Sequence, residues 1–192
     1  AAGELLYYLE SLSSKFNLNG VELLESLIEK AKKELPNVNF KVGSILDKNI
    51  IPKNQFDKSF LSGVLSIFDD FESPINNIIN FTKKGGKVYV FGIFNPYPID
   101  VFLKYKLSKN NNVQQELESG WNNFSIESIS NFLNKHRKVK NFYFKKFLIN
   151  IDLKPVKNDS IRSWTFKGED KSNIITNGLS IIQNQYLLVI EL

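Results

Sequence analysis

Hydrophobic positions in the first part of the chain recur at two different spacings, and these predict an alternation of helices and strands. Residues 3–16 carry leucine at positions 5, 6, 9 and 12, the spacing of one helix face. A short run at 19–22 predicts a strand. Residues 25–35 again have helical spacing, and the proline at position 36 ends that pattern. The chain thus opens as helix, strand, helix.

The same alternation continues to residue 94. Side chains alternate at 38–42, apolar side chains begin and end the segment 56–61, and an apolar run occupies 88–91, so these segments are predicted strands. Residues 73–81 predict a helix, and the glycine pair within 84–87 predicts a tight turn into the strand at 88–91. Strict alternation of strand and helix predicts an α/β fold with a doubly wound, mostly parallel, Rossmann-like sheet.

The second half of the chain has a different pattern. Residues 95–124 hold two prolines and a polar run, and we expect them to form a cover inserted in a single domain that spans 1–192. Ser125 is suited to cap a helix at 125–135. The tail is rich in strand-forming residues at 139–153, 163–167, 172–177 and 185–191.

Composition narrows the function classes. The net charge is +5, but all but two of the 25 basic residues are lysine and they are spread along the chain, which favours solvated faces over a nucleic-acid site. No apolar stretch approaches the ~20 residues that a membrane span needs. The chain has no cysteine and one histidine, so no metal site is predicted. The excess of lysine, asparagine and isoleucine is typical of an AT-rich, bacterial genome and suggests a cytoplasmic protein; the oligomeric state stays open.

Two residues near the start are spaced as in a nucleotide-binding unit. Gly3 opens the first helix, and Glu22 ends the first predicted strand nineteen residues later. A glycine turn lets the backbone approach a cofactor, and an acid at a strand tip accepts hydrogen bonds from a ribose diol. No apolar strand precedes residue 1, so we expect the chain to be an N-terminally incomplete copy of a larger domain, without its first strand.

Four segments in this order resemble the class I S-adenosylmethionine-dependent methyltransferases of the small-molecule group. They are the glycine turn at 1–4, the acid and helix at 20–32, the turn at 43–45, and the strand and exit loop at 55–65 with the turn at 84–88. In this family the last strand inserts antiparallel into the sheet, which suits the β-rich tail. The resemblance implies transfer of a methyl group from S-adenosylmethionine to a small-molecule acceptor.

The resemblance also implies site residues. The positions that match the cofactor-binding segments are Gly3, Glu22, Leu23, Ser44, Ile45, Ser62 and Gly63. Ser44 departs from the acid usual at its position. Candidate acceptor contacts follow the strand at 88–91 and open the helix at 125: Phe94, Asn95, Tyr97 and Trp121, with Asn122 and Asn123 beside it. Aromatic rings suit a sulfonium cation, but Phe94 and Trp121 are equally suited to be core residues.

No catalytic residue is identified. A nitrogen or carbon acceptor needs no base, whereas a hydroxyl acceptor does, and His136, Asp100 and Tyr97 are the candidates that the chain offers. Two other functions stay open. Gly3 and Glu22 alone suit a nicotinamide-dependent oxidoreductase equally well. The chain could also be a catalytically inactive relative that binds cofactor and acts as a partner protein.

Overall fold

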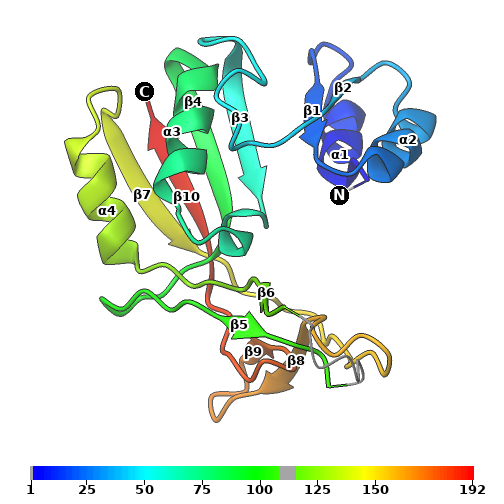
Figure 1. The fold of residues 1–192 in the computed structure, drawn as a ribbon, viewed down its shortest axis with the longest axis vertical. Helices are drawn as coiled ribbons and strands as arrows, with labels where there is room; N and C mark the ends of the chain where they lie inside the picture. The colour runs from blue at the N-terminus through cyan, green and yellow to red at the C-terminus, as the bar shows by residue number, and fades with distance from the viewer. Residues whose placement is uncertain (1, 109–115) are drawn as a thin grey trace. The chain divides into compact units, whose positions relative to one another are not determined.

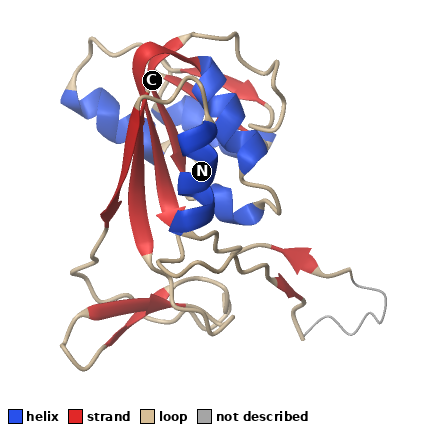
Figure 2. Ribbon diagram, turned by 90° about the vertical axis from the view of Figure 1, so that its left-hand side faces the viewer, coloured by secondary structure: helices blue, strands red, loops and turns tan. Residues whose placement is uncertain are grey.

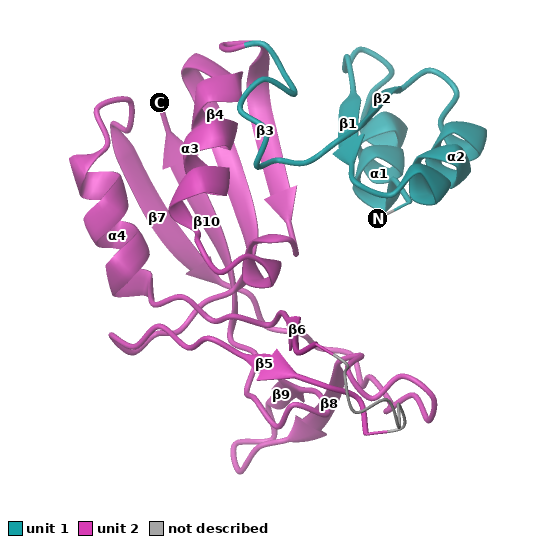
Figure 3. Ribbon diagram, in the orientation of Figure 1, with its two compact units in different colours: residues 1–52 teal, residues 53–192 magenta. Residues whose placement is uncertain are grey.

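The computed structural model describes residues 2–108 and 116–192, and its contacts divide the chain into two compact units. Unit 1 comprises residues 1–52 and unit 2 comprises residues 53–192 (Figure 3). Residues 109–115, part of the predicted cover, lie outside the described residues. The single domain over 1–192 and the first strand before residue 1 stay predictions.

Unit 1 is a parallel strand pair connected by a helix. β1 (Asn19–Glu22) pairs along its length with β2 (Asn39–Val42), and α2 (Glu25–Glu34) connects the two. α1 (Glu4–Leu12) precedes β1 and ends four residues before the predicted end at 16, because the backbone at position 13 is extended. The buried apolar side chains of this unit are Ile28, Ala31, Leu35, Val38 and Ile50.

Unit 2 is built on a sheet with the strand order β3-β4-β10-β7 (Figure 1). β3 (Phe56–Ser62) and β4 (Thr82–Ile93) are parallel. β10 (Gln185–Glu191) is antiparallel to both of its neighbours, β4 and β7 (Asn141–Lys146). The last strand therefore lies inside the sheet and runs against the others, which confirms the predicted antiparallel C-terminal strand.

Helices complete this unit. α3 (Glu72–Phe81) follows the short 3-10 helix η1 (Leu65–Ile67) and packs against β3 and β4 through buried isoleucines. α4 (Ile126–Lys135) packs beside it, since Phe71, just before α3, and Phe132 of α4 have ring centroids 5.8 Å apart. The core lies between these helices and the strands, where Val88, Val90, Leu188 and Ile190 are fully buried.

The glycine pair at 85 and 86 differs from the prediction. The segment is not a turn before the strand but an irregularity within β4, which begins at Thr82. Thr82 pairs with Phe56, and the register then shifts so that Lys87 pairs with Lys58. The chain end decides this, because the Gly85 amide donates to the Leu192 carbonyl at 2.8 Å and the Leu192 amide donates to the Gly86 carbonyl at 3.1 Å.

Two short antiparallel pairs lie beyond one end of the sheet of unit 2 (Figure 2). β5 (Lys104–Tyr105) pairs with β6 (Glu118–Ser119), and β8 (Trp164–Lys167) pairs with β9 (Asn173–Thr176). The first pair belongs to the segment predicted to be a cover. The second, with β7 and β10, confirms the β-rich tail.

The α/β class is confirmed by this arrangement of helices and strands. Within the described parts of the chain, 2–108 and 116–192, no helix is long and apolar enough to cross a membrane.

Candidate functional site

Glu22 is the last residue of β1, and its carboxylate holds the start of α2. Oε1 accepts hydrogen bonds from the Leu23 amide at 2.8 Å and the Leu24 amide at 3.1 Å. Partial burial by itself would raise the pKa of this carboxyl, but hydrogen bonds to it, among them those from Leu24 and Leu23, hold the pKa below its usual value. The side chain is therefore an ionised acceptor at neutral pH.

The turn after β2 lies beside Glu22. The two strands are parallel and end together, with Glu22 opposite Val42, and the Gly43 amide donates to the Glu22 carbonyl at 3.0 Å. Ser44 begins the turn: its Oγ accepts from the Leu46 amide at 3.1 Å. The structure thus brings Glu22, Leu23, Ser44 and Ile45 to the same carboxyl edge of a parallel strand pair, where ligands bind in open α/β sheets.

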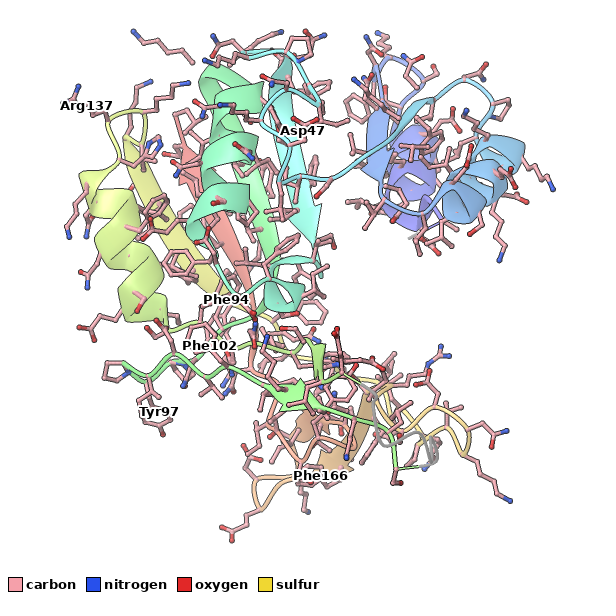
Figure 4. All side chains as sticks on the ribbon, in the orientation of Figure 1. Asp47, Phe94, Tyr97, Phe102, Arg137 and Phe166 are labelled. Carbon is pink, nitrogen blue, oxygen red and sulfur yellow. The ribbon has the colours of Figure 1, made fainter. Side chains whose placement is uncertain are left out.

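Asp47 is a residue at this edge that the sequence analysis did not select. Its amide donates to the Ser44 carbonyl at 3.0 Å, so the acid closes the turn that Ser44 opens. Its side chain is exposed, and Oδ1 accepts from the Asn49 amide at 2.8 Å (Figure 4). An acid in the turn, five residues after the end of the strand, was the available signal. It was missed because the acid was expected at position 44.

Gly3 precedes the first turn of α1, and only glycine suits its place. Its φ is 96°, in the left-handed region. A Cβ here would also lie 3.1 Å from Leu35 Cδ1 and 3.2 Å from Ala31 Cβ. The absence of a side chain therefore lets the start of α1 pack against the end of α2, and this packing alone accounts for the glycine. The predicted cofactor contact of Gly3 stays a prediction.

Ser62 and Gly63 stand at the carboxyl end of β3 in unit 2, and both are exposed. Ser62 is opposite Phe91 of β4, and the Gly63 amide donates to the Phe91 carbonyl at 2.8 Å. The φ of Gly63 is 69°, and a Cβ there would meet no atom within 4 Å. Backbone conformation, and not crowding, requires this glycine, and the space beside it is open.

The segment 95–124 leaves β4 and returns alongside itself. The Asn95 amide donates to the Phe124 carbonyl at 2.9 Å, and Val101 and Asn123 exchange two backbone hydrogen bonds of 3.0 and 2.8 Å. The Asn95 side chain is used within its own loop, since Nδ2 donates to the Ile99 carbonyl at 2.8 Å. Tyr97 is 68% exposed (Figure 4).

The sequence suits Phe94 either to contact the acceptor or to be a core residue, and in the structure it lies in the core. Its side chain is fully buried. The ring makes edge contacts with Phe144 at 5.4 Å and Tyr186 at 6.4 Å between centroids. Phe94 is thus a core residue between β4, β7 and β10 in this structure. Trp121 is half-buried, and its φ of 62° is in the left-handed region, which an aromatic residue rarely adopts.

Asn122 fastens the returning end of this segment to the loop after β3. Its side chain is fully buried, and Nδ2 donates to the Phe68 carbonyl at 2.7 Å and to Asp69 Oδ1 at 2.8 Å. Oδ1 accepts from the Leu103 amide at 2.8 Å, and the Asn122 amide donates to the Ser66 carbonyl at 2.8 Å. The backbone amide and both polar side-chain atoms of this residue therefore support the local structure.

Asp69 extends the same connection to the β5–β6 pair. Lys104 Nζ donates to Oδ2 at 2.6 Å, and Ser119 Oγ donates to Oδ1 at 2.7 Å. The hydrogen bond from Lys104, followed by those from Ser119 and Asn122, lowers the pKa of the Asp69 carboxyl to about 2. The base of the segment 95–124 is thus held at the exit of β3 by an ionised aspartate.

Two of the candidate general bases, Asp100 and His136, lie at opposite ends of α4. Asp100 completes the cap of α4: Oδ1 accepts from the Ser125 amide at 2.5 Å, and Oδ2 accepts from Ser128 Oγ at 2.8 Å. His136 follows the opposite end of that ten-residue helix, which is about 15 Å away at 1.5 Å per residue. Burial, and then the charge of Lys138, lowers the pKa of His136. Among the described residues, no group of three His, Cys, Asp or Glu side chains could hold a metal ion.

Comparisons with known proteins point to one family. Residues 1–123 match the sequence model of the family described as "Methyltransferase domain". A protein of Invertebrate iridescent virus 6, provisionally described as methyltransferase 235L, is 32% identical over 88 residues, which make up 46% of this chain and 32% of that protein. The matched region therefore spans about a third of that relative's length.

Solved structures resemble the chain as a whole. The YcgJ protein of Bacillus subtilis has a TM-score of 0.60 at 12% identity, with 99% of this chain and 88% of that chain covered. A 1,6-didemethyltoxoflavin-N1-methyltransferase of Burkholderia thailandensis, whose structure holds 1,6-didemethyltoxoflavin and S-adenosylhomocysteine, has a TM-score of 0.52 at 13% identity, with 98% and 65% covered. At these identities the resemblance establishes the fold. Because the family match extends over residues 1–123, well over half of the 192 residues, the protein belongs to the family of methyltransferase domains.

Proposed function

We propose that the protein transfers a methyl group from S-adenosylmethionine to a small-molecule acceptor. The observation that carries the proposal is the carboxyl edge of β1 and β2, where the ionised Glu22 lies beside the turn that begins at Ser44. Membership of the methyltransferase family favours methyl transfer over the hydride transfer that Gly3 and Glu22 alone also suit.

The residues at this edge fit the adenosine part of the cofactor. A carboxylate has about four acceptor positions, so Glu22 has the capacity to accept from a ribose diol in addition to the Leu23 and Leu24 amides. Leu23 is 64% exposed beside it and offers an apolar surface for the adenine ring. Ile45 adds a second apolar side chain. Asp47, or Ser44 itself, supplies an acceptor for the adenine amino group.

Bound S-adenosylmethionine supplies an electrophilic methyl carbon: the acceptor lone pair forms the new bond while the carbon–sulfur bond breaks and its electrons stay on sulfur. The protein's own contribution is alignment and exclusion of water. A neutral amine needs no base, because the proton leaves the alkylated nitrogen for solvent. This suits a chain in which Asp100 is engaged in a helix cap and His136 follows the far end of α4.

We assign the acceptor side to the segment 95–124, with Tyr97 and Trp121 as contacts. The exposure of Tyr97 and the left-handed backbone of Trp121 support this, because strained backbone is retained where it positions a functional group. A small-molecule acceptor is further supported by the Burkholderia enzyme of the same fold, which holds 1,6-didemethyltoxoflavin. Ser62 and Gly63 are proposed cofactor contacts on the resemblance alone. A cytoplasmic location is likewise proposed from composition alone.

Calorimetric titration of the protein tests the proposal. We expect S-adenosylmethionine and S-adenosylhomocysteine to bind in the micromolar range and nicotinamide dinucleotides to give no heat. Nicotinamide binding without a response to S-adenosylhomocysteine would assign an oxidoreductase instead. Cofactor binding without turnover over a broad set of acceptors would assign an inactive, cofactor-binding relative.

A further inference from the structure

Asn123 follows Asn122 in the chain, but its side-chain oxygen lacks the hydrogen bond that the side-chain oxygen of Asn122 accepts. Its side chain is 9% exposed, and Oδ1 is a buried acceptor with no hydrogen-bond partner among the described residues. The neighbouring Asn122 is fully buried, with both side-chain polar atoms bonded. A buried carbonyl oxygen without a partner costs free energy, so such groups in folded proteins usually bind a water or a ligand.

The backbone of Asn123 is fixed at the carboxyl edge of β3 and β4. Its two hydrogen bonds with Val101 hold it in the segment 95–124. Asn122, one residue before it, is bonded to Ser66 just after β3, and Phe124, one residue after it, is bonded to Asn95 just after β4. In parallel α/β sheets the ligand lies outside these strand ends. The unpartnered oxygen therefore belongs to the part of unit 2 where an acceptor molecule would lie.

The backbone two residues earlier supports a ligand-binding role independently. Trp121 has a φ of 62°, a conformation that is strained for a bulky L-residue and that is retained most often at functional sites. An unsatisfied acceptor and a strained backbone thus occur two residues apart in the chain, at 123 and 121. Each disfavours the free protein, and contacts with a bound molecule would compensate both.

We propose that Asn123 positions the methyl acceptor, its Oδ1 accepting a hydrogen bond from an uncharged N–H or O–H group of that molecule. This inference rests on the proposed function. A carboxamide is neutral, so it suits a neutral donor. The two aspartates bonded to neighbouring residues are already engaged: Asp69 with Lys104 and Ser119, and Asp100 with Ser125 and Ser128. A cationic acceptor would need such a carboxylate. Neutral amines and anilines, which need no base, are the class that fits.

The test uses the full chain saturated with S-adenosylhomocysteine and matched pairs of small compounds in ligand-observed NMR. Each pair is an N–H or O–H compound and its fully methylated analogue, such as aniline with N,N-dimethylaniline. For at least one pair, the wild type should bind the donor compound about tenfold more tightly, as for one hydrogen bond of ~1.4 kcal/mol. Asn123→Leu should lose this preference, and Asn123→Asp, which keeps a carbonyl oxygen, should retain part of it.

Thermal unfolding of the free protein supplies a readout that a merely structural role would not give. Asn123→Leu removes an unsatisfied group and should raise Tm by roughly 2–6 °C. Asn122→Leu removes satisfied hydrogen bonds and should lower Tm. The inference is wrong, while the proposed function stands, if Asn123→Leu lowers Tm as Asn122→Leu does. It is also wrong if no pair of compounds shows a preference for the donor that the wild type has and Asn123→Leu lacks. If the wild type fails to bind S-adenosylhomocysteine, both are wrong.

Discussion

Asn122 Nδ2 donates a hydrogen bond to Asp69 Oδ1 at 2.8 Å, across 53 positions of the chain. This bond joins the loop after β3 to the returning end of the segment 95–124. Lys104 and Ser119 bond the same carboxylate, so both strands of the β5–β6 pair are held at the same point. The segment proposed to contact the acceptor is thereby anchored to the strand whose exit is proposed to contact the cofactor.

Asp69→Asn should make the protein less stable at neutral pH and have little effect in strong acid. The pKa of Asp69 is lowered to about 2 in the folded protein, below its ordinary value of 3.8. The stability it contributes is therefore complete above about pH 4 and is lost as the pH falls toward 2. Unfolding midpoints of the wild type and the variant should differ at pH 7 and converge near pH 2. Lys104→Met should reproduce most of the difference; a constant difference at all pH values would contradict the assignment.

Asp100→Ala should loosen the first turn of α4. Asp100 accepts from the Ser125 amide and from Ser128 Oγ, and Ser125 Oγ accepts from the Ser128 amide at 3.0 Å. Loss of a helix cap costs ~1–2 kcal/mol. Urea unfolding should show this loss, and hydrogen exchange should show it concentrated at the start of α4. Because the two residues act in one network, Ser125→Ala combined with Asp100→Ala should cost less than the sum; strict additivity would count against a shared cap.

Glu22→Gln and Glu22→Ala should separate binding from folding. Glutamine keeps a carbonyl oxygen for the Leu23 and Leu24 amides, so its thermal stability should stay close to that of the wild type. It loses the charge and one acceptor, and affinity for S-adenosylhomocysteine should fall about tenfold or more. Alanine should lower both. Since the pKa of Glu22 is held below its ordinary value of 4.5, affinity in the wild type should be constant from neutrality down to about pH 5. Unchanged affinity in Glu22→Gln would exclude this carboxylate from the cofactor site.

Gly3→Ala should cost more stability than Gly63→Ala. Both glycines have φ in the left-handed region, at 96° and 69°, which costs an L-residue ~1–2 kcal/mol. At Gly3 the new Cβ would also press on Leu35 and Ala31, whereas at Gly63 it would meet open space. Chemical denaturation of the two variants should give this order. If Gly63→Ala impairs S-adenosylhomocysteine binding at near-normal stability, the open space beside Gly63 is occupied by the ligand.

Much of the fold could be predicted from the sequence because it depends on neighbouring residues. Helical spacing gave α2 and α3 to within about a residue, and the apolar run at 88–91 lies inside β4. Ser125 caps α4 as its residue type suggests. The order of the four matching segments identified the family, and the family match over residues 1–123 confirms it. The roles of the proposed site residues stay predictions; these residues are Gly3, Glu22, Leu23, Ser44, Ile45, Ser62, Gly63, Asn95, Tyr97 and Trp121.

Periodicity, caps and turns follow from the sequence alone, because side chains a few positions apart set them. The pairings between distant segments follow only from the folded structure. It placed Phe94 in the core between strands that follow it by 50 and 92 positions, gave the second half of the Ser125 cap to Asp100, and moved the start of β4 to Thr82 by pairing its glycines with Leu192. It also satisfied Asn122 and left the Asn123 oxygen without a partner, although the sequence presents the two asparagines alike. Such differences arise because hydrogen-bond partners and burial depend on which distant segments the topology brings together. The local pattern of residues does not specify those contacts.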